Sequence, residues 1–129
     1  MKTIGKISTF DDEKKMAFGW ASVSEIDGVP VTDSEGDIIP IAELEKAAYD
    51  FVEVYRAGGE MHEKNNVARL IESVVFTPEK FSAMGIAATE LPLGWWVGFK
   101  IVDDAVWQKV KSGEYNMFSI GGKAVRNNG

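Results

Sequence analysis

Two stretches near the start of the chain alternate apolar and polar residues, and this pattern predicts a β-hairpin. Lys2–Thr9 and Lys15–Ile26 both have the period of a strand, and the charged segment Phe10–Lys14 between them suits a turn. In the second stretch, small residues occupy every other position and are expected to line one face. The segment from Gly28 to Asp37 is rich in turn residues and is expected to be a loop.

The clearest helix follows Pro40, a residue that suits the first helical position. Apolar residues then recur at steps of three and four, which is the period of a helix with one buried face. They are Ile41, Leu44, Ala48, Phe51 and Tyr55. The opposite face is charged and is expected to face water, and Gly58-Gly59 is expected to end the helix.

The second half of the chain predicts two further strands with a short helical segment between them. Val67–Thr77 is rich in β-formers, and Gly94–Val102 is the most apolar strand candidate. Residues 78–85 suggest one or two helical turns, followed by a loop through Pro92. The four tryptophans (Trp20, Trp95, Trp96 and Trp107) are expected in the core and at its rim.

A helix, a glycine and a strand are expected to follow one another from residue 103 to residue 122. Asp103 or Asp104 can cap the helix, and Gly113 supplies the left-handed residue that ends it. Tyr115–Ile120 then alternates like a strand, with Met117 and Ser119 on one face and their neighbours on the other. Gly121 and Gly122 follow directly, which is typical of a bulge or of a place where another backbone comes close.

The order of these elements predicts an α+β fold, with mainly antiparallel strands in a β-barrel or curved sheet and helices flanking it. Strands outnumber helices and do not alternate with them regularly. At 129 residues the length favours a single domain spanning residues 1–129.

Composition narrows the function classes. A net charge of −6 without any block of Lys or Arg argues against nucleic acid as the main partner. The chain contains no cysteine, which excludes thiolate catalysis, cysteine-type zinc sites and disulfides. We expect an intracellular, soluble protein with no membrane partner, because no signal peptide and no apolar run of the required ~18 residues is present.

Ser119 and His62 are the candidates for nucleophilic chemistry. Hydrolysis of an amide by serine needs a hydroxyl, a base that takes its proton, and donors for the oxyanion. His62 is the only histidine in the chain and can titrate near neutral pH. Their separation in sequence does not reveal contact, so a packed or surface histidine and a structural serine remain alternatives.

A metal site is an alternative use of the same segment. Glu60, His62 and Glu63 could act as ligands, although two carboxylates and one histidine form a poor zinc set. A calcium site near Asp33 and Asp37 is conceivable, but the spacing falls short of an EF-hand loop. No metal or other cofactor is expected.

Several motifs in order resemble the XkdF-type serine proteases of tailed phages and prophages. The resemblance covers nearly the whole chain and comprises Gly19-Trp-Ala-Ser-Val23, Asp33-Ser-Glu-Gly-Asp37, Met61-His62, Ser73-Val-Val-Phe-Thr77, Gly94-Trp-Trp-Val-Gly98, Val110-Lys-Ser-Gly-Glu-Tyr115 and Phe118-Ser-Ile-Gly-Gly122. That family is related to phage prohead maturation proteases and to herpesvirus assemblin. It implies an assemblin-like barrel ringed by helices.

The resemblance also implies roles for single residues. His62, which follows Met61, corresponds to the general base, and Ser119, the last residue of the Ser-Gly-x-Tyr-x-x-x-Ser pattern, corresponds to the nucleophile. Amides near Gly121 and Gly122 are candidates for the oxyanion site or for contact with the substrate backbone. In these families the third member of the triad lies on a strand after the nucleophile. Since this chain ends at Gly129, we expect either that it is truncated at its C-terminus or that the orienting group comes from within it, with Glu72 as the substitute candidate.

Two functions from different classes follow. The first is a serine endopeptidase of phage head maturation, which acts on scaffold and major capsid proteins inside the prohead, in the cytoplasm of the bacterial host. The resemblance also implies that the chain self-associates as a homodimer. The second is a non-catalytic capsid-assembly domain that binds scaffold peptides along a sheet edge. A metal-dependent enzyme is a third reading.

Overall fold

The computed structural model describes residues 3–32, 36–56, 68–114, 117–119 and 124–125. Its strands form one antiparallel sheet in the order β4-β5-β2-β1-β6-β7, with β3 paired to β2 beside this path. The strands are β1 (Thr3–Asp11), β2 (Met16–Ile26), β3 (Val29–Pro30), β4 (Ala68–Phe76), β5 (Leu93–Ile101), β6 (Met117–Ser119) and β7 (Ala124–Val125). The predicted α+β class is confirmed: of the two predicted alternatives, a β-barrel or a curved antiparallel sheet with flanking helices, the structure has the sheet, and this sheet is open.

Three helices are described, and a capping side chain marks the start of two of them. They are α1 (Ile41–Arg56), α3 (Pro78–Met84) and α4 (Asp104–Lys111). Thr77 caps α3 by accepting the Lys80 N–H at 3.2 Å, and Asp103 caps α4 by accepting the Val106 N–H at 2.9 Å. Of the two predicted caps for the last helix, Asp103 is therefore the one used.

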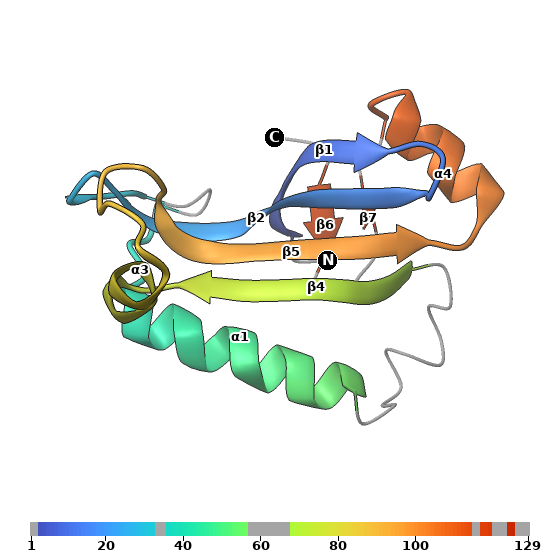
Figure 1. Ribbon diagram of the computed structural model, residues 1–129. Coiled ribbons are helices and arrows are strands. Elements are labelled where there is room, and N and C mark those ends of the chain that lie inside the picture. The colour runs from blue at the N-terminus through green and yellow to red at the C-terminus, as the bar shows by residue number, and fades with distance from the viewer. Residues whose placement is uncertain (1–2, 33–35, 57–67, 115–116, 120–123, 126–129) are drawn as a thin grey trace.

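The core lies between one face of the sheet and the helices α1 and α4. Figure 1 shows α1 lying along this face beneath β4 and β5, with α4 at the far end of the sheet beside β1 and β2. Helix α1 contributes Leu44 and Ala48 to the core, as its three-and-four spacing predicts. Strand β5 contributes the alternate residues Trp95, Val97, Phe99 and Ile101, each at most 5% exposed.

Small residues of β2 and β5 let these strands lie close to their neighbours. Ala17 and Ala21 of β2 are buried on the core face, which confirms the predicted face of small side chains. On the opposite face, Gly94 and Gly98 of β5 leave room for the rings of Trp20 and Phe18. A larger residue at either glycine would collide with a neighbour that is already in place.

The tryptophans occupy the predicted core and rim positions. Trp95 and Trp107 are buried, at 5% and 1% exposed. Trp20 and Trp96 are half-buried and pack edge to face, with ring centroids 5.4 Å apart. None of the described helices is long and apolar enough to cross a membrane.

Candidate catalytic strand and its supports

Ser119 is the last residue of β6, a short strand held between two others. In the β1–β6 pairing Ser119 lies opposite Thr3, and Met117 lies opposite Lys6. On its other side β6 pairs with β7, where Met117 lies opposite Val125. The prediction that Ser119 lies on a strand is confirmed, although the described strand is shorter than the predicted Tyr115–Ile120. Strand β6 is thus paired on both sides, and Ser119 itself is paired with Thr3 of β1.

The other serine of the same motif, Ser112, caps the end of α4. Its hydroxyl donates to the Lys109 carbonyl oxygen at 3.1 Å and accepts the Glu114 N–H at 3.4 Å. Gly113 follows with a φ of 83°, the left-handed conformation that the sequence predicts for the end of this helix. Ser112 therefore has a structural role, and Ser119 remains the motif's candidate nucleophile.

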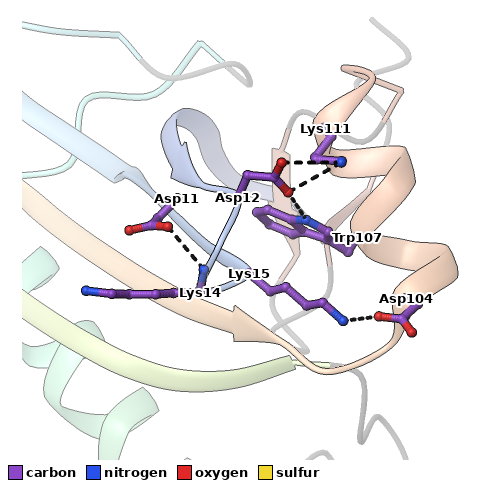
Figure 2. Close-up of polar contacts among 7 residues, drawn as sticks. All are labelled: Asp11, Asp12, Lys14, Lys15, Asp104, Trp107 and Lys111. Atoms are coloured by element: carbon purple, nitrogen blue, oxygen red, sulfur yellow. Dashed lines mark hydrogen bonds and ion pairs between the residues drawn. The ribbon is translucent and has the colours of Figure 1, made fainter.

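Helix α4, which leads into β6, is tied to the β1–β2 turn by a cluster of polar contacts (Figure 2). The Trp107 indole N–H donates to Asp12 at 2.9 Å, and the Lys111 ammonium lies 3.3 Å from the same carboxylate. Lys15 forms a second ion pair with Asp104 at the start of the helix. The turn and the helix are thus held together at both ends of α4.

The Asp12 carboxylate is stabilised in its charged form by this cluster. The Trp107 hydrogen bond is the main cause that lowers the pKa of Asp12 below its ordinary value, and Lys111 acts in the same direction. Partial loss of hydration opposes both effects. Phe10 packs edge to face against the Trp107 ring, with centroids 5.7 Å apart, which adds an apolar contact between β1 and α4. The tie fixes the start of the segment that carries Ser119 relative to β1.

Glu72, the candidate orienting acid, lies on β4 and is exposed. Its carboxylate accepts the Trp96 indole N–H at 2.9 Å, across from β5. The pairing of β4 with β5 shifts register between Leu70 and Glu72, which places Glu72 opposite Gly98. The structure thus gives Glu72 a partner that the sequence did not indicate.

Strand order sets Glu72 and Ser119 apart in the sheet. Strands β5, β2 and β1 lie between β4 and β6. In a flat sheet, four strand spacings of roughly 4.8 Å would separate them by about 19 Å. A contact between the two residues through a histidine therefore requires curvature of the sheet or a chain segment that crosses it.

The remaining predicted site residues lie outside the described part of the chain. These are His62, Gly121 and Gly122, together with Glu60 and Glu63 of the metal alternative. Asp33 of the conceivable calcium loop lies outside it as well. Among the described residues, no group of three or more His, Cys, Asp or Glu could hold a metal ion.

Comparison with known proteins shows which family the sequence matches. The family model described as "Putative phage serine protease XkdF" matches residues 3–128. The "Uncharacterized protein YqbD" of Bacillus subtilis (strain 168) is 33% identical over 114 residues, which cover 88% of this chain and 33% of that protein. The "Phage-like element PBSX protein XkdF" of the same strain is 32% identical over 114 residues, 88% of this chain and 38% of that protein.

The chain spans about a third of the length of these curated relatives. No solved structure matches significantly. The match nevertheless extends from β1 to beyond β7, and so includes every described element of the sheet and all three helices. The chain belongs to the family of the phage serine protease XkdF.

Proposed function

We propose that the chain is a serine endopeptidase domain of phage head maturation that cleaves scaffold and major capsid proteins. The observation that carries the proposal is the position of Ser119 at the end of a strand paired on both sides, within a chain that the family model matches from residue 3 to residue 128. Catalysis needs a nucleophile whose backbone is held in place by rigid elements. Strand β6 and the tied helix α4 provide such a support.

In the proposed reaction, the Ser119 hydroxyl oxygen attacks the carbonyl carbon of the scissile peptide bond, and His62 takes the hydroxyl proton. The developing oxyanion accepts hydrogen bonds from backbone amides near Gly121 and Gly122. The C–N bond then breaks, and His62 returns the proton to the leaving amine. Water hydrolyses the resulting ester and regenerates Ser119.

The proposal places a spatial requirement on the chain. His62 belongs to the segment between α1 and β4, whereas Ser119 lies on β6, with three strands between β4 and β6. His62 precedes Ala68 by six positions in the sequence, and at ~3.4 Å per residue an extended chain of this length reaches about 20 Å. The segment is therefore long enough to bridge the gap expected between strands β4 and β6 in a flat sheet.

Co-expression tests this function directly. The chain is produced together with the scaffold and major capsid proteins of the same phage or prophage, and the products are followed by intact-protein mass spectrometry. We expect discrete cleavage products that vanish in Ser119→Ala and in His62→Ala. Ser112→Ala is the matched control, because this nearby serine caps a helix and should leave cleavage intact. Equal cleavage by wild type and Ser119→Ala would refute the proposal.

A non-catalytic capsid-assembly domain is the second candidate, and the edge of the sheet favours it. Strand β4 ends the strand order, and no described strand pairs with its outer side. An extended scaffold peptide can add to a sheet edge of this kind as a further strand. In the same co-expression, this function predicts stable complexes without cleavage. Those complexes would be weakened by Ile71→Pro, a change of an exposed residue of β4.

The same proposal includes the place of cleavage and the oligomeric state of the chain. Cleavage of scaffold and capsid proteins would take place inside the prohead, in the bacterial cytoplasm. Self-association as a homodimer belongs to the proposal too. Size-exclusion chromatography with light scattering checks it, and a monomer at every concentration would remove that part.

A further inference from the structure

The β2–β3 turn, α3 and the loop leading into β5 lie at the same end of the sheet (Figure 1, left). Residues of all three line a largely apolar pocket. Its volume is about 390 Å³, within the usual range for ligand pockets. The apolar lining is formed by Pro78, Phe81, Ile86, Leu91 and Leu93. Phe81 is only 3% exposed and is anchored by the ring of Phe76, 6.0 Å away, so this wall is firmly packed.

The charged residues that line the pocket are both acidic. Glu25 and Asp27 come from the end of β2 and from the turn after it. Glu25 is half-buried, and within the described residues its carboxylate has neither a hydrogen bond nor an ion pair. A cationic group placed beside these two carboxylates in a largely apolar pocket would gain a favourable electrostatic interaction.

The nearest lysine on α3 does not serve this purpose. The Lys80 ammonium donates to the Val75 carbonyl oxygen and to the Tyr49 hydroxyl, each at 2.8 Å. It also lies 3.6 Å from a Glu45 carboxylate oxygen. Lys80 is thus engaged with α1 and β4, and none of the residues lining the pocket is basic.

Asp27 lies in a tight turn, and exposed apolar residues flank this turn. Asp27 and Gly28 have φ values of 50° and 79°, as in the tight type I′ turn of a hairpin. Ile26 and Val29, the paired residues on either side of this turn, are 53% and 63% exposed. An occupant that uses the pocket and this surface together is longer than a single small molecule.

We propose that this pocket docks an extended peptide segment, taking up one large apolar side chain while a neighbouring Lys or Arg of the peptide pairs with Glu25 and Asp27. The occupant is chosen on charge: both charged groups in the lining are negative, and the half-buried Glu25 has no partner among the described residues. The proposal does not depend on peptidase activity. The pocket contains none of the candidate catalytic residues, and it can recognise a peptide whether or not the peptide is cut.

Nuclear magnetic resonance of the uniformly ¹⁵N-labelled Ser119→Ala chain tests the proposal without interference from cleavage. The probe is acetyl-Gly-Lys-Leu-Lys-Gly-amide. One control peptide carries Glu in place of both Lys residues, and the other carries Ser in place of Leu. We expect the probe to shift the amide signals of Ser82, Ile86 and Leu93, with much smaller shifts from either control peptide.

Two variants locate the interaction. Glu25→Gln combined with Asp27→Asn should weaken binding of the probe by about fivefold, the effect of losing two partly exposed ion pairs. Glu79→Gln, on the same helix α3 but outside the pocket lining, is the matched control and should bind like the parent. Ala88→Phe places a ring at the pocket lining and should block entry of the leucine side chain while leaving the rest of the spectrum intact.

Several outcomes would overturn the inference. Equal shifts with the Glu-containing peptide would remove the role of charge, and equal shifts with the Ser-containing peptide would remove the apolar anchor. Shifts centred on β4 would place the peptide at the sheet edge. Concentration-dependent shifts of the pocket signals without peptide would show that a second copy of the chain occupies the pocket.

Discussion

The Trp107 indole N–H donates to the Asp12 carboxylate at 2.9 Å, and this bond joins residues 95 positions apart in the sequence. It connects the turn between the first two strands to the helix that leads into β6. Trp107 is 1% exposed, so its polar atom would lack a partner without this acceptor. Two segments far apart in the sequence are thereby held together, and one of them leads into the strand that carries Ser119.

Replacing Asp12 should lower the melting temperature, because it removes the charged acceptor of a buried donor. We expect a clear decrease for Asp12→Ala and a smaller one for Asp12→Asn, which retains an acceptor oxygen. Glu13→Gln, in the same turn, is the matched control: Glu13 is exposed and has no partner among the described residues. Thermal unfolding followed by circular dichroism measures all three. A Glu13→Gln decrease as large as that of Asp12→Ala would argue against a specific Asp12 contact.

The lowered pKa of Asp12 predicts that the stability of the fold depends on pH. Its pKa in the folded chain is lowered from 3.8, so the folded state favours the charged form more than the unfolded state does. The stabilisation is therefore fully present above this value and is lost as the pH falls through the lowered pKa. The difference in melting temperature between wild type and Asp12→Asn should be constant from pH 7 to pH 5 and should shrink in more acidic buffer. A difference that grows with acidity would contradict the assignment.

The two glycines of β5 should differ in their tolerance of a methyl group. A β-carbon at Gly94 would lie 2.5 Å from the Ser22 carbonyl oxygen, a backbone atom that cannot move without disturbing β2. At Gly98 the nearest atoms, at 2.7 and 2.8 Å, belong to the Phe18 ring, which can turn away. We expect Gly94→Ala to cost about 3 kcal/mol of unfolding free energy and Gly98→Ala about 1 kcal/mol. Urea unfolding measures both, and the reverse order would contradict this account of the strand packing.

Glu72→Gln tests the substitute orienting acid. Glutamine preserves an acceptor oxygen for the Trp96 indole N–H, so we expect stability to change little. Because Glu72 is already engaged by Trp96 and lies three intervening strands from β6, we also expect peptide hydrolysis to stay within several-fold of wild type. Loss of a true orienting carboxylate lowers turnover by about 10⁴. A loss of that size, with an unchanged melting temperature, would identify Glu72 as that residue.

Elements with a sustained period were predictable from the sequence. The apolar residues of α1 recur over four turns, and the alternation in β2 spans most of the strand, so their type and face follow from the pattern. Strand β5 was predicted from its apolar composition alone. The two-residue strands β3 and β7 are too short to show a period. Residues 29–37 were expected to be a loop, and β3 is present there because Glu25 and Ile26 pair back onto Pro30 and Val29.

The arrangement of these elements was less predictable, because it depends on pairings between distant residues. Strand β5 lies between β4 and β2, and nothing local in the three segments specifies that order. For the candidate site, the sequence correctly places Ser119 on a strand and Gly113 at a helix end. It did not predict the Asp12–Trp107 bond. A buried tryptophan needs a hydrogen-bond acceptor for its indole N–H, so an acceptor for Trp107 could have been expected. The sequence does not reveal which carboxylate is that acceptor.

Labelling with a serine-directed phosphonate probe tests the central claim most directly, since such a probe reacts only with a hydroxyl that a nearby base has activated. Wild type, Ser119→Ala, His62→Ala and the helix-capping control Ser112→Ala are treated side by side, and the modified residue is located by peptide mass spectrometry. We predict labelling of Ser119 in wild type and in Ser112→Ala, and none in the other two. Absence of label from Ser119 in a folded wild-type chain, or undiminished labelling in His62→Ala, would contradict the account.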